Sequence, residues 1–231
     1  MKVLITGADG YIGRALSRRL GAAGARLQGR PIERLTLCDL QLPAAPSAAW
    51  VHTVAGSIAD PAVIDAVTRE QPDVVFHLAS VPSGQSESQH DLGLAVNVHA
   101  TLALVDALGR SGKVPHLVFT SSIAVFGAPL PPLIDDDTPL RPTLSYGAQK
   151  QMMEIHLADC TRRGLVKARS LRLPGVVARP PTPTGALSAF SSELIRALVA
   201  HQPCVCPVSP KATLWLLSLE ACIDNLLHAA Q

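Results

Sequence analysis

Three glycines near the N-terminus restrict the fold of this chain more than any other feature. Gly7, Gly10 and Gly13 directly follow the apolar run Val3–Thr6, so they lie where a strand turns into a helix. Gly7 permits a tight turn, Gly10 lets a ligand approach the backbone, and Gly13 lets the helix pack against the strand. Free N–H groups at such a helix start bind pyrophosphate. This arrangement predicts a dinucleotide-binding site.

Short runs rich in Val, Ile and Leu alternate with amphipathic stretches along the first 173 residues. The predicted strands are Val3–Thr6, Leu35–Asp39, Trp50–Val54, Val74–Leu78, Leu117–Ser121 and Ala168–Leu173. The predicted helices are Ile12–Ala23, Pro61–Glu70, Leu92–Arg110 and Tyr146–Arg163. Several of the strands are apolar throughout, which is typical of strands buried on both faces of a parallel sheet. We therefore predict an α/β fold, a Rossmann doubly wound parallel sheet with right-handed crossovers.

The alternation weakens after Leu173. A helix over Ser188–Ala200, a short strand over Thr213–Leu217 and a final helix over Leu219–Ala230 are expected there. We therefore expect residues 1–173 to form a dinucleotide-binding domain and residues 174–231 to form a small, apparently incomplete substrate-binding lobe.

The composition excludes several classes of protein. Hydrophobic residues make up 48% of the 231 residues, enough for a large core, and a net charge of +2 gives no basic surface for nucleic acid. The chain enters a strand at once, so we expect no signal peptide, and we expect no apolar run long enough to span a membrane. We expect a cytoplasmic protein with no membrane partner. The five cysteines and eight histidines show no ligand spacing, so no metal site is predicted.

An acidic residue ends the second predicted strand. Asp39 is placed to accept hydrogen bonds from the hydroxyls of an adenosine ribose and to repel a 2′-phosphate. It therefore favours NAD as the cofactor. Arg30 and Arg34 lie nearby in the sequence and leave NADP as the alternative.

A phenol and an ammonium group four residues apart are the candidate catalytic pair. Tyr146 and Lys150 share one face of a predicted helix, and a neighbouring cation lowers the pKa of a phenol so that it can accept a proton from an alcohol. Ser122, at the end of the strand before this helix, is the candidate that orients the substrate oxygen. Asn97 lies inside a helical run, where its amide could bond backbone at a kink and hold a water molecule for proton relay.

Together these residues resemble the extended short-chain dehydrogenase/reductase family, which includes epimerases and dehydratases acting on nucleotide sugars. The segment Ser121–Gly127 is similar to the Ser-Ser-x-x-Val-Tyr-Gly stretch of that family, with Phe126 in place of Tyr. Ser57 stands where members usually carry Asp. The resemblance implies a homodimer, formed through the helices over 92–110 and 146–163. Beyond the glycines, Asp39, Tyr146 and Lys150, the expected cofactor contacts are Tyr11, Ile12, Ser57, Ile58, Leu78, Ala79 and Ser80.

Within that family, the segments Ser83–Glu87, Ser145–Lys150 and Cys206–Pro210 resemble dehydrogenases that oxidise the C2 hydroxyl of a four-carbon sugar acid. The substrate implied is therefore a small sugar acid. The expected substrate contacts are Ser83, Gln85, Ser122, Tyr146, Arg172 and Arg179, where an arginine would hold the substrate carboxylate. Arg141 is a weaker candidate for that role.

Other activities of the same fold remain as alternatives. Ile123 and Ala124 follow the serine where dehydratases usually carry an acidic pair, which disfavours water elimination. An epimerase uses the same Tyr and Lys, and a catalytically silent NAD sensor or truncated relative shares the fold. The chain ends earlier than extended members usually do, so a truncated substrate lobe is expected.

Overall fold

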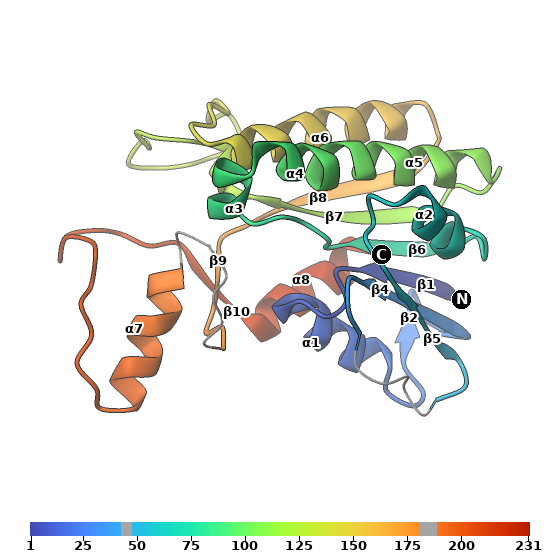
Figure 1. Ribbon diagram of the computed structural model, residues 1–231, viewed down its shortest axis with the longest axis horizontal. Helices are drawn as coiled ribbons and strands as arrows, with labels where there is room; N and C mark the ends of the chain where they lie inside the picture. The colour runs from blue at the N-terminus through green and yellow to red at the C-terminus, as the bar shows by residue number, and fades with distance from the viewer. Residues whose placement is uncertain (43–47, 181–188) are drawn as a thin grey trace.

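The structure, a computed structural model, describes residues 1–42, 48–180 and 189–231, and within them six parallel strands form the main sheet (Figure 1). Their order is β5-β4-β1-β6-β7-β8, so the chain starts in the middle of the sheet and winds outward in both directions. The strands are β1 (Lys2–Thr6), β4 (Arg34–Asp39), β5 (Val51–Ala55), β6 (Val74–His77), β7 (His116–Ser122) and β8 (Lys167–Leu173). All six strands predicted from the sequence are confirmed, as is the doubly wound fold.

Helices cover both faces of this sheet. Helices α1 (Tyr11–Leu20) and α8 (Leu219–Ala229) lie on one face, and α2 (Pro61–Thr68), α5 (Ala100–Arg110) and α6 (Ser145–Arg162) lie on the other (Figure 1). Strand β1 contributes side chains to the core on both faces. Val3 and Ile5 pack in the core on the side of α1 and α8, and Leu4 packs in the core on the side of α2, α5 and α6. A central strand buried on both faces explains why its sequence is apolar rather than alternating.

The helical run on the second face is irregular in the middle. Helix α4 (His90–Gly93) continues into a π-helical turn, η1 (Leu94–His99), and then into α5. The whole run His90–Arg110 is 21 residues long and, by length and composition, apolar enough to cross a membrane. This corrects the expectation that no run reaches that length. In the structure, Leu104 and Leu108 on its inner side pack into the core between this helix and the sheet.

Several short elements were not predicted. Within the described ranges they are β2 (Arg26–Leu27), β3 (Arg30–Pro31), α3 (Ser83–Ser88), the 3-10 turn η2 (Ile123–Val125) and β9 (Gly175–Val177). Strand β9 pairs with β10 (Leu216–Ser218), which lies slightly later than the expected strand over 213–217. Helix α7 (Ala189–Val199) agrees with the expected helix, whose first residue, Ser188, lies outside the described residues. It projects away from the sheet and its layers (Figure 1).

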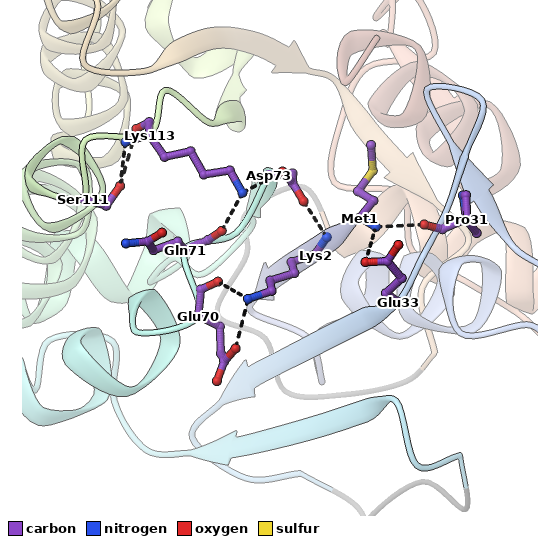
Figure 2. Close-up of polar contacts among 9 residues, drawn as sticks. All are labelled: Met1, Lys2, Pro31, Glu33, Glu70, Gln71, Asp73, Ser111 and Lys113. Carbon is purple, nitrogen blue, oxygen red and sulfur yellow. Dashed lines mark hydrogen bonds and ion pairs between the residues drawn. The ribbon is translucent and has the colours of Figure 1, made fainter.

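Ion pairs fasten the amino ends of the strands, on the side away from the glycine turn (Figure 2). The carboxylate of Asp73, just before β6, accepts a hydrogen bond from the backbone N–H of Lys2 at 2.7 Å and pairs with the Lys113 ammonium at 2.7 Å. The side chain of Lys2 pairs with Glu70 at 3.2 Å. These contacts join β1 to the segments that precede β6 and β7.

Candidate active site at the carboxyl ends of the strands

The glycine turn leaves room for a phosphate group against its backbone. Gly7 has a φ of +71°, and a Cβ added there would lie 2.6 Å from the backbone nitrogen of Ala79. A Cβ on Gly13 would lie 2.0 Å from the carbonyl oxygen of Gly7. Gly10 is the N-cap of α1, and no side chain of the described residues caps that helix. The open N–H groups at its start therefore fit a pyrophosphate.

Asp39 lies beside this turn, at the end of β4. One carboxylate oxygen accepts a hydrogen bond from the backbone N–H of Asp9 at 2.8 Å, and the other accepts from Leu40 at 2.7 Å. Both bonds hold the carboxylate beside the glycine turn. Arg34 begins the same strand, about 16 Å away along extended chain, and pairs with Glu70 at 3.8 Å. It is therefore on the wrong side to hold a 2′-phosphate, and the geometry favours NAD.

The residues expected near the adenine follow β5. The Gly56 N–H donates to the carbonyl of Asp39 at 2.9 Å, which places Ser57 next to the ribose acid. The Ser57 hydroxyl accepts from the Ala59 N–H at 3.2 Å, and Ile58 is buried in the core. Ser57 therefore forms a turn, and its short side chain reaches less far than the aspartate usual in this family.

The segment after β6 closes the other side of the cofactor cleft. Leu78 donates its N–H to the carbonyl of Thr6 at 3.1 Å, so the loop continues the sheet toward Ala79 and Ser80. His77 below it is fully buried between the hydroxyls of Thr6 and Thr101, at 2.7 and 3.0 Å. Burial, with a smaller contribution from Lys150, lowers the pKa of His77 to about 3. His77 is therefore a neutral structural residue.

Asn97, in the π-helical turn, anchors this loop from beneath. Its Oδ1 accepts hydrogen bonds from the Val81 N–H at 2.8 Å and the Ser80 hydroxyl at 3.0 Å. Its amide nitrogen donates to the Val81 carbonyl at 3.1 Å and to the Gln149 side chain at 2.7 Å. Asn97 therefore bonds backbone at an irregular turn, as expected, and it acts on the loop that carries Ser80.

Tyr146 and Lys150 lie on one face of α6, above β7. The Lys150 ammonium is 4.6 Å from the centre of the Phe119 ring and 5.4 Å from that of Tyr146. Lys150 is only 1% exposed, and burial lowers its pKa to about 7, opposed by the charge of Glu154. Burial also raises the pKa of Tyr146, while a hydrogen bond with Ser80 and the charge of Arg179 lower it. The site can therefore exchange a proton near neutral pH once a further positive charge is present.

Ser122 precedes the turn η2, against which the first turn of α6 packs. The Ser122 hydroxyl accepts from the Ala124 N–H at 3.1 Å and so caps the turn η2. A Cβ on Gly147 would lie 2.3 Å from the Ala124 carbonyl oxygen, so the first turn of α6 rests directly on η2. The hydroxyl proton of Ser122 stays available for an oxygen bound beside Tyr146.

The two arginines expected to bind a carboxylate differ in their surroundings. Arg172, on β8, makes a two-pronged ion pair with Glu154 at 2.8 and 3.1 Å and lies 5.3 Å from the Phe126 ring centre. The hydroxyl of Ser121 donates to the same carboxylate. Arg172 is therefore held by this chain's own acid. Burial raises the pKa of Tyr146 and of Tyr11, and the charge of Arg179, just after β9, opposes that rise at both phenols.

The remaining expected residues lie on α3 and at the start of α1. Ser83 and Gln85 are on α3, and Gln85 donates to Gln89 at 3.2 Å. The Tyr11 hydroxyl donates to the carbonyl of Ala178 at 3.1 Å, which links the glycine turn to the segment carrying Arg179. Ile12 packs against the core of the first face.

Sequence reasoning missed two polar residues on α6. Glu154 lies one turn after Lys150, and Gln149 directly precedes it. The four-residue spacing from Lys150 could have indicated Glu154, because side chains at that spacing share a helix face. Nothing in the sequence indicated that Gln149 is buried against Asn97, since the two are far apart along the chain.

Comparison with known proteins agrees with this geometry. A sequence model of the NAD dependent epimerase/dehydratase family matches residues 3–213. D-erythronate dehydrogenase of Cupriavidus necator is 44% identical and that of Haemophilus influenzae 35% identical; each alignment covers all of this chain and 72% of the relative. The crystal structure of the nucleoside-diphosphate-sugar epimerase from Agrobacterium tumefaciens superposes with a TM-score of 0.92 at 38% identity, over all of this chain and 69% of that one.

These matches span the glycine turn, the ribose acid and the Tyr–Lys helix together. The chain therefore belongs to the NAD-dependent epimerase/dehydratase family, as an oxidoreductase with NAD as its cofactor.

Proposed function

We propose that this protein is a D-erythronate dehydrogenase, which oxidises the C2 hydroxyl of D-erythronate to give 2-dehydro-D-erythronate. The observation that carries the proposal is the contact between Lys150 and the Tyr146 ring on α6, whose first turn rests on the turn that Ser122 caps at the end of β7. The names of the two relatives, matched over the whole of this chain, support the substrate.

In this proposal Tyr146 accepts the proton of the substrate hydroxyl. Burial alone raises the pKa of the phenol, so nearby cations must favour the phenolate. Arg179 supplies positive charge there, and so does Lys150, which lies against the Tyr146 ring, whenever it is protonated. Ser122 donates its hydroxyl proton to the same substrate oxygen and fixes its position. NAD, when bound by the glycine turn and Asp39, supplies the hydride acceptor.

Arg179 is the residue we assign to the substrate carboxylate. Arg172 already shares its guanidinium with Glu154, and breaking that pair would leave a largely buried carboxylate unpaired. Arg179 makes no such ion pair within the described part of the chain; its Nε donates to the Val176 carbonyl at 3.3 Å. Ser83 and Gln85, on α3, are assigned to the remaining hydroxyl groups of the sugar acid.

An epimerase is the second candidate, because the superposition with the nucleoside-diphosphate-sugar epimerase is close. Both activities need Tyr146 and Lys150, but an epimerase returns the hydride and forms no net NADH.

A homodimer in the cytoplasm is also part of the proposal. Met152 and Ile155 on α6 are 49% and 66% exposed, and a second copy would cover these apolar side chains.

The test is NADH formation with D-erythronate and NAD, measured on the wild type and on Tyr146→Phe. The wild type should turn over, while the variant should lose at least about a hundredfold in kcat and still bind NAD in calorimetry. Net NADH from D-erythronate excludes an epimerase as the main activity. NAD binding without turnover of any four-carbon sugar acid would refute the dehydrogenase assignment, and conversion of a nucleotide sugar would then establish the epimerase.

A further inference from the structure

We infer that Gln149 is a positioning residue that holds helix α3, and with it Ser83 and Gln85, at a fixed height above Tyr146. Helix α3 lies beside the start of α6 (Figure 1). The inference rests on the proposed function in one respect, the assignment of Ser83 and Gln85 to the substrate. The contact between the helices does not depend on that assignment.

A buried chain of hydrogen bonds runs from α6 to α3. The Gln149 Oε1 accepts from the Asn97 amide nitrogen at 2.7 Å, and that nitrogen also donates to the Ser86 hydroxyl at 3.2 Å. Ser86 in turn donates to the Val81 carbonyl at 3.0 Å. Gln149, Asn97 and Ser86 are 2%, 1% and 0% exposed, so water does not compete for these bonds.

The orientation of both amides is fixed by the backbone. The Val81 N–H can only donate, so the Asn97 atom that it meets must be the oxygen. The Asn97 nitrogen then faces Gln149, and Gln149 must present its oxygen. Its own Nε2 is left over, and among the described residues it has no hydrogen-bond partner. This orientation leaves the Gln149 Nε2 as a buried donor without a partner in the described chain, which costs free energy of folding. We infer from this cost that the accepting Oε1 has a structural role.

Close packing fixes the position of the Gln149 amide. A Cβ added to Gly93, at the end of α4, would lie 2.9 Å from the Gln149 Nε2 and 3.2 Å from the Cβ of Ser86. A side chain at position 93 would therefore push the amide out of place. The glycine and the glutamine are complementary in shape.

A second contact lies on the other side of Tyr146. The carboxylate of Glu87, on α3, accepts a hydrogen bond from the Ser145 N–H at 2.9 Å. It serves as the cap of α6, whose N-cap residue Leu144 has no side-chain cap bond in the described chain. Ser145 and Gln149 flank Tyr146 by one position and by nearly one turn, so α3 is fastened to the catalytic helix on both sides of the phenol.

The experiment replaces Gln149 by methionine, which keeps the length of the side chain and removes the acceptor. The control is Gln151→Met, the same change two positions further along α6. Steady-state kinetics with D-erythronate, NAD binding by calorimetry and amide hydrogen exchange are measured on both. For Q149M we expect a KM about tenfold higher, a kcat within about threefold, and an NAD affinity within about twofold of wild type. Exchange should accelerate about tenfold in residues 83–89 and stay unchanged in β7.

Gly93→Ala tests the same contact without removing the glutamine, and it serves if Q149M does not fold. It should reproduce the rise in KM and the faster exchange in residues 83–89. Unchanged exchange in both variants, or equal acceleration in β7, would overturn the inference, as would faster exchange with an unchanged KM. If the wild type does not oxidise D-erythronate, the proposed function fails, and the exchange data alone then decide whether Gln149 fastens α3.

Discussion

Replacing Lys150 by methionine should abolish catalysis and at the same time stabilise the folded protein without its cofactor. Lys150 is 1% exposed and lies against the rings of Phe119 and Tyr146. Burial lowers the pKa of its ammonium from 10.5 to about 7, so the fold disfavours the charged form. Methionine has nearly the same length, fits among aromatic rings and carries no charge to bury.

The size of the effect follows from the pKa. One pH unit corresponds to about 1.4 kcal/mol, so at pH 6 the charged Lys150 costs the folded state roughly 5 kcal/mol. Contacts between the ammonium and the two rings return roughly 1 to 2 kcal/mol. We therefore expect K150M to raise the free energy of unfolding by about 3 kcal/mol at pH 6, which is about 6 to 12 °C in Tm for a domain of this size.

The sign of the pH dependence is specific to this lysine. Its folded pKa lies below its unfolded value, so above pH 7 the unfolded chain binds more protons than the folded one, and the wild type gains stability. The advantage of K150M should therefore shrink by about 1.4 kcal/mol per pH unit above 7 and be nearly gone at pH 9.

Chemical unfolding at pH 6, 7.5 and 9, without NAD, measures this difference. Lys211→Met, at an exposed position, is the control for the loss of a lysine as such. A K150M protein that is less stable than wild type at pH 6, or a difference that does not change between pH 6 and 9, would refute the reasoning.

Three further predictions concern the cofactor cleft and the sheet. Gly13→Ala should abolish NAD binding in calorimetry, because its Cβ would lie 2.0 Å from the Gly7 carbonyl oxygen; binding within tenfold of wild type would contradict the role of this turn. Asp39→Asn should weaken NAD about tenfold and narrow the preference over NADP, and two unchanged dissociation constants would refute the ribose assignment. Asp73→Asn should lower the free energy of unfolding by about 1 to 2 kcal/mol at pH 7. Burial raises the pKa of Asp73, but hydrogen bonds from Lys113 and the Lys2 N–H outweigh it and hold the pKa below its usual value. That stabilisation is present above about pH 4 and is lost as the pH falls through the folded pKa, so an equal deficit at pH 3 and pH 7 in urea unfolding would contradict it.

The sheet could be predicted because its causes are local. Val3–Thr6 and Val74–His77 are buried throughout and almost entirely apolar, since both of their faces are covered, and the glycine turn must follow a strand. The short elements β9 and β10 were harder to predict, because a pair of three-residue strands leaves no periodicity in the sequence. Helix α3 follows Pro82 and carries three serines, a composition typical of a loop.

The partners of polar side chains could not be predicted from spacing. Arg172 was a reasonable candidate for the substrate carboxylate, because it ends a strand at the correct edge of the sheet. Its guanidinium instead meets Glu154, which α6 brings over β8 from eighteen positions earlier. The sequence spacing of Tyr146 and Lys150 predicts a shared helix face, but it contains no information on which acids from other elements are close to them.

The depressed pKa of Lys150 shows what spacing and position leave undetermined about a Tyr-x-x-x-Lys pair. On an exposed helix, the tyrosine and lysine of such a pair would keep their usual pKa values, and neither could transfer a proton efficiently at pH 7. Here burial disfavours charge on Lys150, while Glu154 and the contact with the Phe119 ring oppose that effect. Burial therefore makes both groups sensitive to an added charge. The residues that act on the pair come from β7 (Phe119), from α6 (Glu154), and from the segments after β6 and β9 (Ser80 and Arg179). The proton chemistry of Tyr146 and Lys150 therefore depends on the folded sheet. The segment 146–150 in another fold would not have these pKa values.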